Sequence, residues 1–252
     1  MSFPRFATLL APAIAILIAG CGGGGGGGGA AYDGGALLCD VMIDSPHRYS
    51  AAVIFDSVAP DTPILGAPAA PPPFHIESTI EAAAEDGDTI HATIHTTDGG
   101  ALNSTVEAII DGAARWLRNG EQPWQDLATA NADYSPIAYR PLQTCQALAV
   151  DFDPSTLSGE DEEVDGISGK RYDLTDFRSD FPDRMPDIGT GSVVSGLVNV
   201  FAGSVWVADA GYVSRLDLTG VGTYSDGTTL SARFTYTISD RGDDISVDLP
   251  TA

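Results

Sequence analysis

The residues whose spacing can be tested for chemistry are two histidines and an acidic run. His91 and His95 are four residues apart, but on a strand that spacing covers about 13 Å, so one metal ion cannot bind both as neighbouring ligands. The run at 151–153, followed by Glu162, imitates a calcium-binding loop, yet Thr156 stands where such a loop needs glycine. We therefore predict exposed structural histidines, a solvated acidic loop, no metal site and no cofactor.

No residue is predicted to be catalytic. The sequence contains no nucleophile elbow, zinc-protease motif, phosphate-binding loop or dinucleotide fingerprint. Composition excludes further classes, because 12 Lys and Arg stand against 35 Asp and Glu, a net charge of −23. Phosphates of nucleic acids would be repelled, and so would an anionic membrane surface. We predict no nucleic-acid partner, and any membrane attachment must come from something other than charge.

Cys21 follows a segment with the layout of a signal peptide. Arg5 and the amino terminus supply positive charge, and residues 7–20 form an apolar run too short to span a bilayer. The sequence Ile18-Ala19-Gly20-Cys21 resembles the lipobox of bacterial lipoproteins, in which the cysteine receives a diacylglycerol and becomes the mature N-terminus. The resemblance implies an exported protein that Cys21 anchors to the cell membrane or outer membrane, facing the periplasm or the exterior. The alternative is an ordinary signal peptide followed by a chance cysteine.

A run of eight glycines, Gly22–Gly29, directly follows Cys21. Glycine has no side chain to pack and keeps the largest backbone freedom, so this run is expected to act as a tether. Its root-mean-square length is on the order of 15 Å. We therefore expect a signal peptide at 1–20, a lipidated cysteine and tether at 21–35, and one folded domain at 36–252.

Cys39 and Cys145 remain once Cys21 carries lipid. Two cysteines in an exported domain are expected to pair. A bridge between them would close a loop of roughly 105 residues and stabilise the fold by about 4–5 kcal/mol. The alternative is two buried free thiols.

Alternating apolar and polar residues predict a mainly β domain with a few helices. Turn residues separate the alternating segments, a pattern typical of an antiparallel meander that is solvated on one face. A proline-rich loop is expected at 58–73, an acidic loop at 159–165, and a further short segment around Trp124. The expected strands are 49–57, 74–82, 89–97, 103–111, 113–118, 164–174, 204–208, 212–219, 230–238 and 245–249.

Helices are expected at 36–44, 135–150 and 192–202. In the last of these, Val193, Leu197, Val200 and Phe201 recur at helical spacing in an uncharged stretch. Strands with one apolar face must bury that face. These three helices are the elements expected to cover it.

The order of several motifs resembles the LolA-like envelope lipoproteins, in particular their LppX/LprG branch, over about residues 37–250. The passages that carry the resemblance are Trp116–Trp124, Glu163–Ile167 with Arg171–Leu174, Val205–Leu216 and Tyr236–Asp240. The chain departs from the family in its long proline loop and its very acidic surface. The resemblance implies an antiparallel sheet curled into an open half-barrel, with helices covering the concave apolar face.

Members of that family hold acyl chains of lipids or of other lipoproteins in the apolar hollow. By that analogy the residues expected to face the hollow are those on the apolar side of the alternating segments and of the covering helix. They are Ile90, Ile94, Leu197, Phe201, Leu216, Leu218, Phe234 and Tyr236.

Three functions compete at this point. The first is a membrane-anchored carrier or holder whose partners are lipid or lipoprotein acyl chains. The second is a structural or adhesive surface lipoprotein with a filled core and no ligand, and the third is an unrecognised enzyme. Lipid that copurifies with the protein would distinguish the first from the second.

Overall fold

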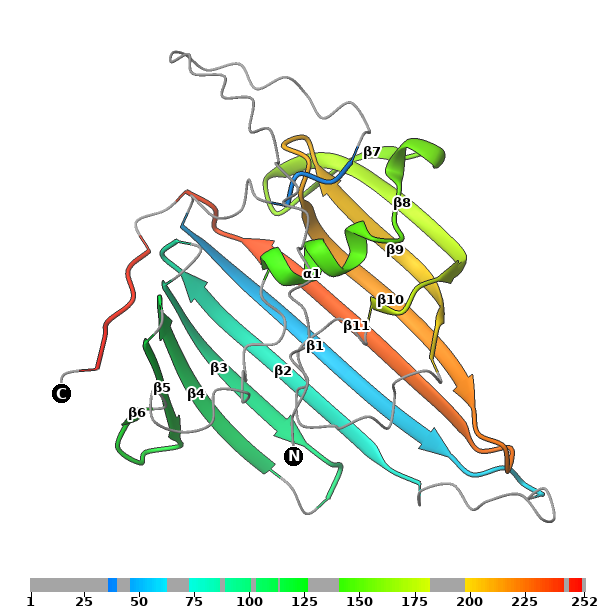
Figure 1. The fold of residues 1–252 in the computed structure, drawn as a ribbon, viewed down its shortest axis with the longest axis horizontal. Helices are drawn as coiled ribbons and strands as arrows, with labels where there is room; N and C mark the ends of the chain where they lie inside the picture. Colours follow the sequence, from blue (N-terminus) through cyan, green and yellow to red (C-terminus); the bar gives the residue numbers. More distant parts are fainter. Residues whose placement is uncertain are drawn as a thin grey trace, which may run out of the picture.

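The computed structural model describes residues 36–39, 46–62, 73–86, 89–100, 103–112, 114–126, 141–181, 198–242 and 245–250. Their main element is one antiparallel sheet of eleven strands (Figure 1). The strand order is β6-β5-β4-β3-β2-β1-β11-β10-β9-β8-β7. The sheet does not close, since β6 and β7 form its two edges. The expected mainly β, antiparallel fold is confirmed.

Each strand lies beside its neighbour in sequence except β6 and β7, which form the two edges, and the first and last strands pair in the middle of the sheet. The strands are β1 (His47–Val58), β2 (His75–Ala84), β3 (Thr89–Thr97), β4 (Asn103–Asp111), β5 (Ala114–Asn119), β6 (Gln125–Asp126), β7 (Glu160–Val164), β8 (Ile167–Arg178), β9 (Val200–Ala208), β10 (Val213–Thr223) and β11 (Thr229–Ser239). The pairing of β1 with β11 joins the two halves of the chain into one sheet.

The alternation seen in the sequence sets which face of each strand is buried. On β11 every second residue from Leu230 to Ile238 is buried, and the residues between them are partly or fully exposed. The register carries this face across the sheet, because Phe234 pairs with Val53 of β1 and Leu218 of β10. One face of the sheet is therefore apolar, and the other carries the charges.

The acidic loop expected at 159–165 is wrong, and the strand expected at 164–174 is present from Ile167 onward but begins only after a turn. Residues 160–164 form the edge strand β7, and a turn at Asp165-Gly166 leads into β8. The cations of β8 make this acidic strand possible. Lys170 bonds Asp161, and Arg171 bonds both Glu160 and Glu162.

The expected helix at 192–202 is also wrong at its described end, because Val200–Ala202 belong to β9. Helical spacing of apolar residues was misleading here, since a cross-strand glycine provides the room for Phe201. Gly220 of β10 pairs with Phe201, and a Cβ on Gly220 would lie 2.6 Å from the Phe201 ring. Residues 192–197 lie outside the described residues.

The expected final strand at 245–249 is not formed. β11 is already paired on both sides, with β1 and with β10, so residues 245–249 cannot pair with it. Ile245 and Val247 are instead buried outside the sheet, and the Val247 amide donates a hydrogen bond to the carboxylate of Glu85.

One α-helix, α1 (Pro141–Ala149), lies within the described part of the chain and agrees with the helix expected at 135–150. The expected bridge is present: Cys145 of α1 forms a disulfide with Cys39. Of the early helix expected at 36–44, residues 36–39 are described and are not α-helical. None of the helices in the described ranges has the length and apolar character that crossing a membrane requires.

Candidate ligand-binding site

The residues expected to face a hollow share the apolar face of the sheet. Seven of the eight are described, and their exposed fractions run from 0% at Leu218 to 9% at Ile94. Leu197 lies outside the described residues. The seven come from four strands: Ile90 and Ile94 from β3, Phe201 from β9, Leu216 and Leu218 from β10, and Phe234 and Tyr236 from β11. All belong to one continuous apolar cluster.

Phe234 is at the centre of an aromatic group in the β9–β11 half of the face. The Phe181 ring centroid lies 5.0 Å from those of both Phe201 and Phe234. Phe55 of β1 also contacts Phe234, at a centroid distance of 5.9 Å. Edge-to-face arrangements of this kind add about 0.5–1.5 kcal/mol per pair beyond area burial. This end of the face is densely packed.

The β2–β4 half of the face has a different character. Ala82, Ala92 and Ala108 stand in register on three neighbouring strands and form a transverse row of small side chains. The next row contains Ile80 paired with Ile94. Alanine projects only a methyl group, so the side chains of this row are shorter than those of the isoleucines beside it, and all three alanines are buried.

Tyrosine hydroxyls introduce polarity into the same apolar face. Tyr236 is 1% exposed, and its hydroxyl has no hydrogen-bond partner among the described residues. Burial, together with the nearby phenols of Tyr49 and Tyr212, raises the pKa of Tyr236 well above its ordinary value. The buried hydroxyl of Thr144 on α1 likewise has no such partner. Buried polar groups of this kind are commonly satisfied by water or a polar ligand.

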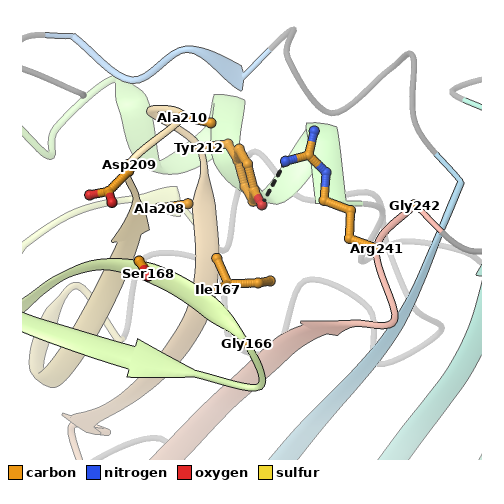
Figure 2. Close-up of a pocket in the computed structure, with 9 residues that line it drawn as sticks. All are labelled: Gly166, Ile167, Ser168, Ala208, Asp209, Ala210, Tyr212, Arg241 and Gly242. Carbon is orange, nitrogen blue, oxygen red and sulfur yellow. Dashed lines mark hydrogen bonds between the residues drawn. The ribbon is translucent and has the colours of Figure 1, made fainter. Parts of the chain in front are cut away.

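A pocket of about 490 Å³ opens at the end of the sheet, and Tyr212 is among the residues that line it (Figure 2). Its walls come from the β7–β8 turn with Ile167, the β9–β10 turn with Tyr212, and Arg241 just after β11. The Arg241 guanidinium donates a 2.9 Å hydrogen bond to the Tyr212 hydroxyl. Tyr212 is also part of the apolar core, and Ile167 packs against it. The pocket is therefore lined both by a guanidinium, that of Arg241, and by residues of the apolar core.

The opposite face of the sheet is polar, and the expected structural histidines lie on it. The His91 ring bonds Glu107, which also accepts two hydrogen bonds from Arg118. These bonds hold the pKa of Glu107 below its usual range, the Arg118 bond being the larger cause. His95 bonds Thr105. These contacts give both histidines structural partners.

The acidic residues form a recess but no metal centre within the described ranges. Asp161, Glu162, Glu163 and Asp209 line a second pocket, at the edge of the sheet. No three metal-ligating side chains among the described residues converge on one point. The calcium-like run is used differently, since the Asp153 side chain caps a short helical turn by accepting a hydrogen bond from the Ser155 amide.

Sequence reasoning missed Arg241, Tyr212 and Phe181 as members of a site. Arg241 and Tyr212 are 29 residues apart in the chain, and no local pattern brings them together. Phe181 lies in a segment rich in aspartate and proline, where an isolated large aromatic residue was the one available signal.

Comparison with protein-family models and with curated proteins gives no match for this chain.

Proposed function

We propose that this protein is a lipid-anchored envelope lipoprotein that holds acyl chains against the apolar face of an open half-barrel. The observation that carries the proposal is the gathering of Ile90, Ile94, Phe201, Leu216, Leu218, Phe234 and Tyr236 on one continuous apolar face. A sheet face of this size and polarity, in a domain whose other face is strongly acidic, suits an apolar ligand.

A helical cover over this face fits the contacts of the segment that follows α1. The Phe152 ring lies 5.7 Å from the ring of Tyr172, which is buried on β8. Cys145 and Leu148 of α1 belong to the same apolar cluster as the sheet residues. In Figure 1, α1 lies across the sheet near β11. We infer that α1 forms part of the cover of the half-barrel.

The alanine row is the part of the face that suits a chain best. An acyl chain gains about 0.8 kcal/mol for each CH₂ that it buries. Ala82, Ala92 and Ala108 would form the floor under such a chain, and Ile80 and Ile94 one wall. The lipid on Cys21 would keep the domain at the membrane from which the chains come.

A structural lipoprotein with a filled core is the second candidate. It is favoured by the aromatic group, in which Phe181 packs directly on Phe201 and Phe234. If the whole face is packed in this way, no ligand is needed to bury it.

Replacing Ala92 with leucine distinguishes the two candidates. In a lipid-holding trough, Ala92→Leu occupies ligand volume, so the amount of bound lipid falls while the melting temperature stays near that of the parent. In a filled core, the larger side chain overpacks the site and costs about 1–3 kcal/mol of stability. Bound lipid is counted by native mass spectrometry and stability by thermal melting. The matched control is Thr93→Leu, which adds an apolar side chain to the opposite face of the same strand.

A further inference from the structure

The two edges of the sheet differ in length. β6 contains only Gln125 and Asp126, and so short a strand offers little backbone to an incoming chain. β7 extends from Glu160 to Val164 and pairs on one side with β8. Among the described residues, no strand pairs with its other side. β7 is therefore the edge of the sheet at which a further strand can be added.

The register of the β7–β8 hairpin shows which backbone groups of β7 point away from the sheet. Asp165 and Gly166 have φ values of 51° and 75°, the left-handed conformations of a two-residue hairpin turn. The residues on either side of such a turn form a hydrogen-bonded pair, and bonded and non-bonded pairs then alternate along the antiparallel ladder. The amide and carbonyl groups of Asp161 and Glu163 therefore point toward the open edge.

This edge is accessible to a partner. The side chain of Asp161 is 88% exposed, and that of Glu160 is 75% exposed. A recess of about 450 Å³ lies at the same edge, and its lining includes Asp161, Glu163 and Asp209. A strand added beside β7 would contact unpaired backbone groups, and its side chains would meet an acidic recess.

The side chains of β7 determine which kind of strand this edge accepts. Four of its five residues are acidic. The described cations that contact them, Lys170 and Arg171, both belong to β8. Glu163 makes no ion pair with any described residue. The carboxylates of β7 thus outnumber the cations beside them, and the edge keeps a net negative charge.

This charge disfavours a second copy of the chain and favours a cationic strand. Two β7 strands side by side would place carboxylates near carboxylates, and like charges on neighbouring strands destabilise their pairing. The net charge of −23 adds repulsion between whole molecules. A strand that carries lysine or arginine would instead bring cations to carboxylates. Charge at this edge therefore selects between partners that would make the same backbone hydrogen bonds.

We propose that β7 binds an extended, lysine- or arginine-rich segment of a partner protein, which joins the eleven-stranded sheet as an additional strand. Backbone hydrogen bonds to Asp161 and Glu163 hold the segment, and the carboxylates of β7 select its cations. This inference goes beyond the proposed function and does not rest on it, because β7 contributes none of the residues proposed to hold acyl chains.

The test measures the binding of short fluorescein-labelled peptides to the full-length protein in a non-ionic detergent, by fluorescence anisotropy at low ionic strength. In the first peptide, lysine alternates with threonine, and in the second, glutamate replaces lysine. The third is the lysine peptide with its central backbone amides N-methylated, which keeps the charge and removes the donors. The lysine peptide should bind, its N-methylated form should bind about tenfold more weakly or worse, and the glutamate peptide should not bind. Added salt should weaken binding of the lysine peptide.

Two substitutions at Glu163 separate charge from backbone. Glu163→Gln removes the carboxylate and should weaken binding of the lysine peptide by about two- to fivefold. Glu163→Pro also removes an amide that points away from β8, so it should weaken binding by about tenfold or more. The matched control is Glu81→Gln, at an exposed position of β2. It changes the net charge equally and should leave peptide binding unchanged. Melting curves show whether each variant is folded.

The outcomes distinguish strand addition from simple charge attraction. Equal binding of the lysine peptide and its N-methylated form would overturn strand addition, and this comparison uses the parent protein alone. An equal loss of affinity in Glu81→Gln and Glu163→Gln would overturn the placement at β7. If the folded parent protein does not bind the lysine peptide, the inference fails, and acyl-chain binding is unaffected because it is measured with lipid.

Hydrogen exchange locates the contact. The amides of Asp161 and Glu163 point away from β8, so they should exchange quickly in the free protein and slow down when the lysine peptide binds. Protection that appears elsewhere in the sheet and not at these amides would contradict the proposal.

Discussion

Glu107 illustrates how the polar face of the sheet is built from charges that satisfy one another. It is held by two hydrogen bonds from Arg118 and one contact with His91. Arg118 in turn lies 4.6 Å from the ring centroid of Trp124. The group links β3, β4, β5 and the segment before β6, so it fixes the edge of the sheet farthest from β7.

We predict that Glu107→Gln lowers the melting temperature at pH 7 by about 2–4 °C, the size expected for one partly buried pair in a domain of this length. Because the pKa of Glu107 is lowered in the folded state, its contribution is present above the unfolded value and is lost as the pH falls through the folded value. The difference between parent and variant should therefore shrink as the pH falls below about 4.5.

The matched control is Glu81→Gln, on an exposed position of β2. It removes the same charge from the acidic surface and should leave the melting temperature nearly unchanged. A difference between parent and Glu107→Gln that stays constant down to pH 3 would contradict the assignment to this carboxylate.

For individual residues, the sequence predicted which face of a strand a side chain lies on, but it did not predict which distant side chains are in contact. Alternation with period two placed Phe234 and Tyr236 on one face and Thr235 on the other, as the structure has them. The contact between Arg241 and Tyr212 depends on the β9–β10 turn and the end of β11 meeting in space. No local pattern contains that information.

A disulfide links two parts of the fold covalently, in addition to the hydrogen bonds between strands. The disulfide between Cys39 and Cys145 joins residues separated by 106 positions and ties the segment before β1 to α1. α1 is a short helix, which is marginal on its own and depends on tertiary contacts. We therefore expect the bridge to determine how firmly α1 is held.

Replacing both cysteines, Cys39→Ala with Cys145→Ala, should destabilise the domain by about 4–5 kcal/mol in the chain-entropy model. Urea unfolding of the parent and of the double variant measures this directly. Reduction of the parent should reproduce most of the loss, and reduction of the double variant should change nothing. Equal midpoints for parent and variant would show that the link is not needed for stability.

Elements with regular alternation were predicted well, and those shaped by their neighbours were not. The bounds of β3 and β4 agree with the expected 89–97 and 103–111. β7 reads as a loop in isolation because it is so acidic, and it becomes a strand only beside Lys170 and Arg171 of β8. β9 depends in the same way on Gly220 across the ladder.

The main element of the described residues is one open sheet whose two halves are joined at β1 and β11. This arrangement gives the sheet one long apolar face, which is buried, and one charged face, as the alternation predicted. The sequence could not specify how that face is covered, because cover depends on which distant segments reach it. The pocket lined by Tyr212 and Arg241 was missed for the same reason.

Membrane attachment concerns the whole molecule. Its net charge of −23 would repel the domain from an anionic surface, so attachment must come from something other than charge. We predict that Cys21→Ser leaves the protein unprocessed or moves it out of the detergent phase in a partitioning experiment. The parent protein should enter the detergent phase. Unchanged partitioning of the variant would show that Cys21 does not carry the anchor.

Native mass spectrometry of the full-length protein, purified from its membrane in a non-ionic detergent, tests acyl-chain binding most directly. A covalent lipid on Cys21 would add a fixed mass that remains after denaturation, so the measurement separates it from any bound ligand. We predict an additional lipid mass in the native spectrum that disappears when the protein is denatured. A native spectrum with the same mass as the denatured protein, from a folded sample offered membrane lipids, would contradict acyl-chain binding and favour the filled core.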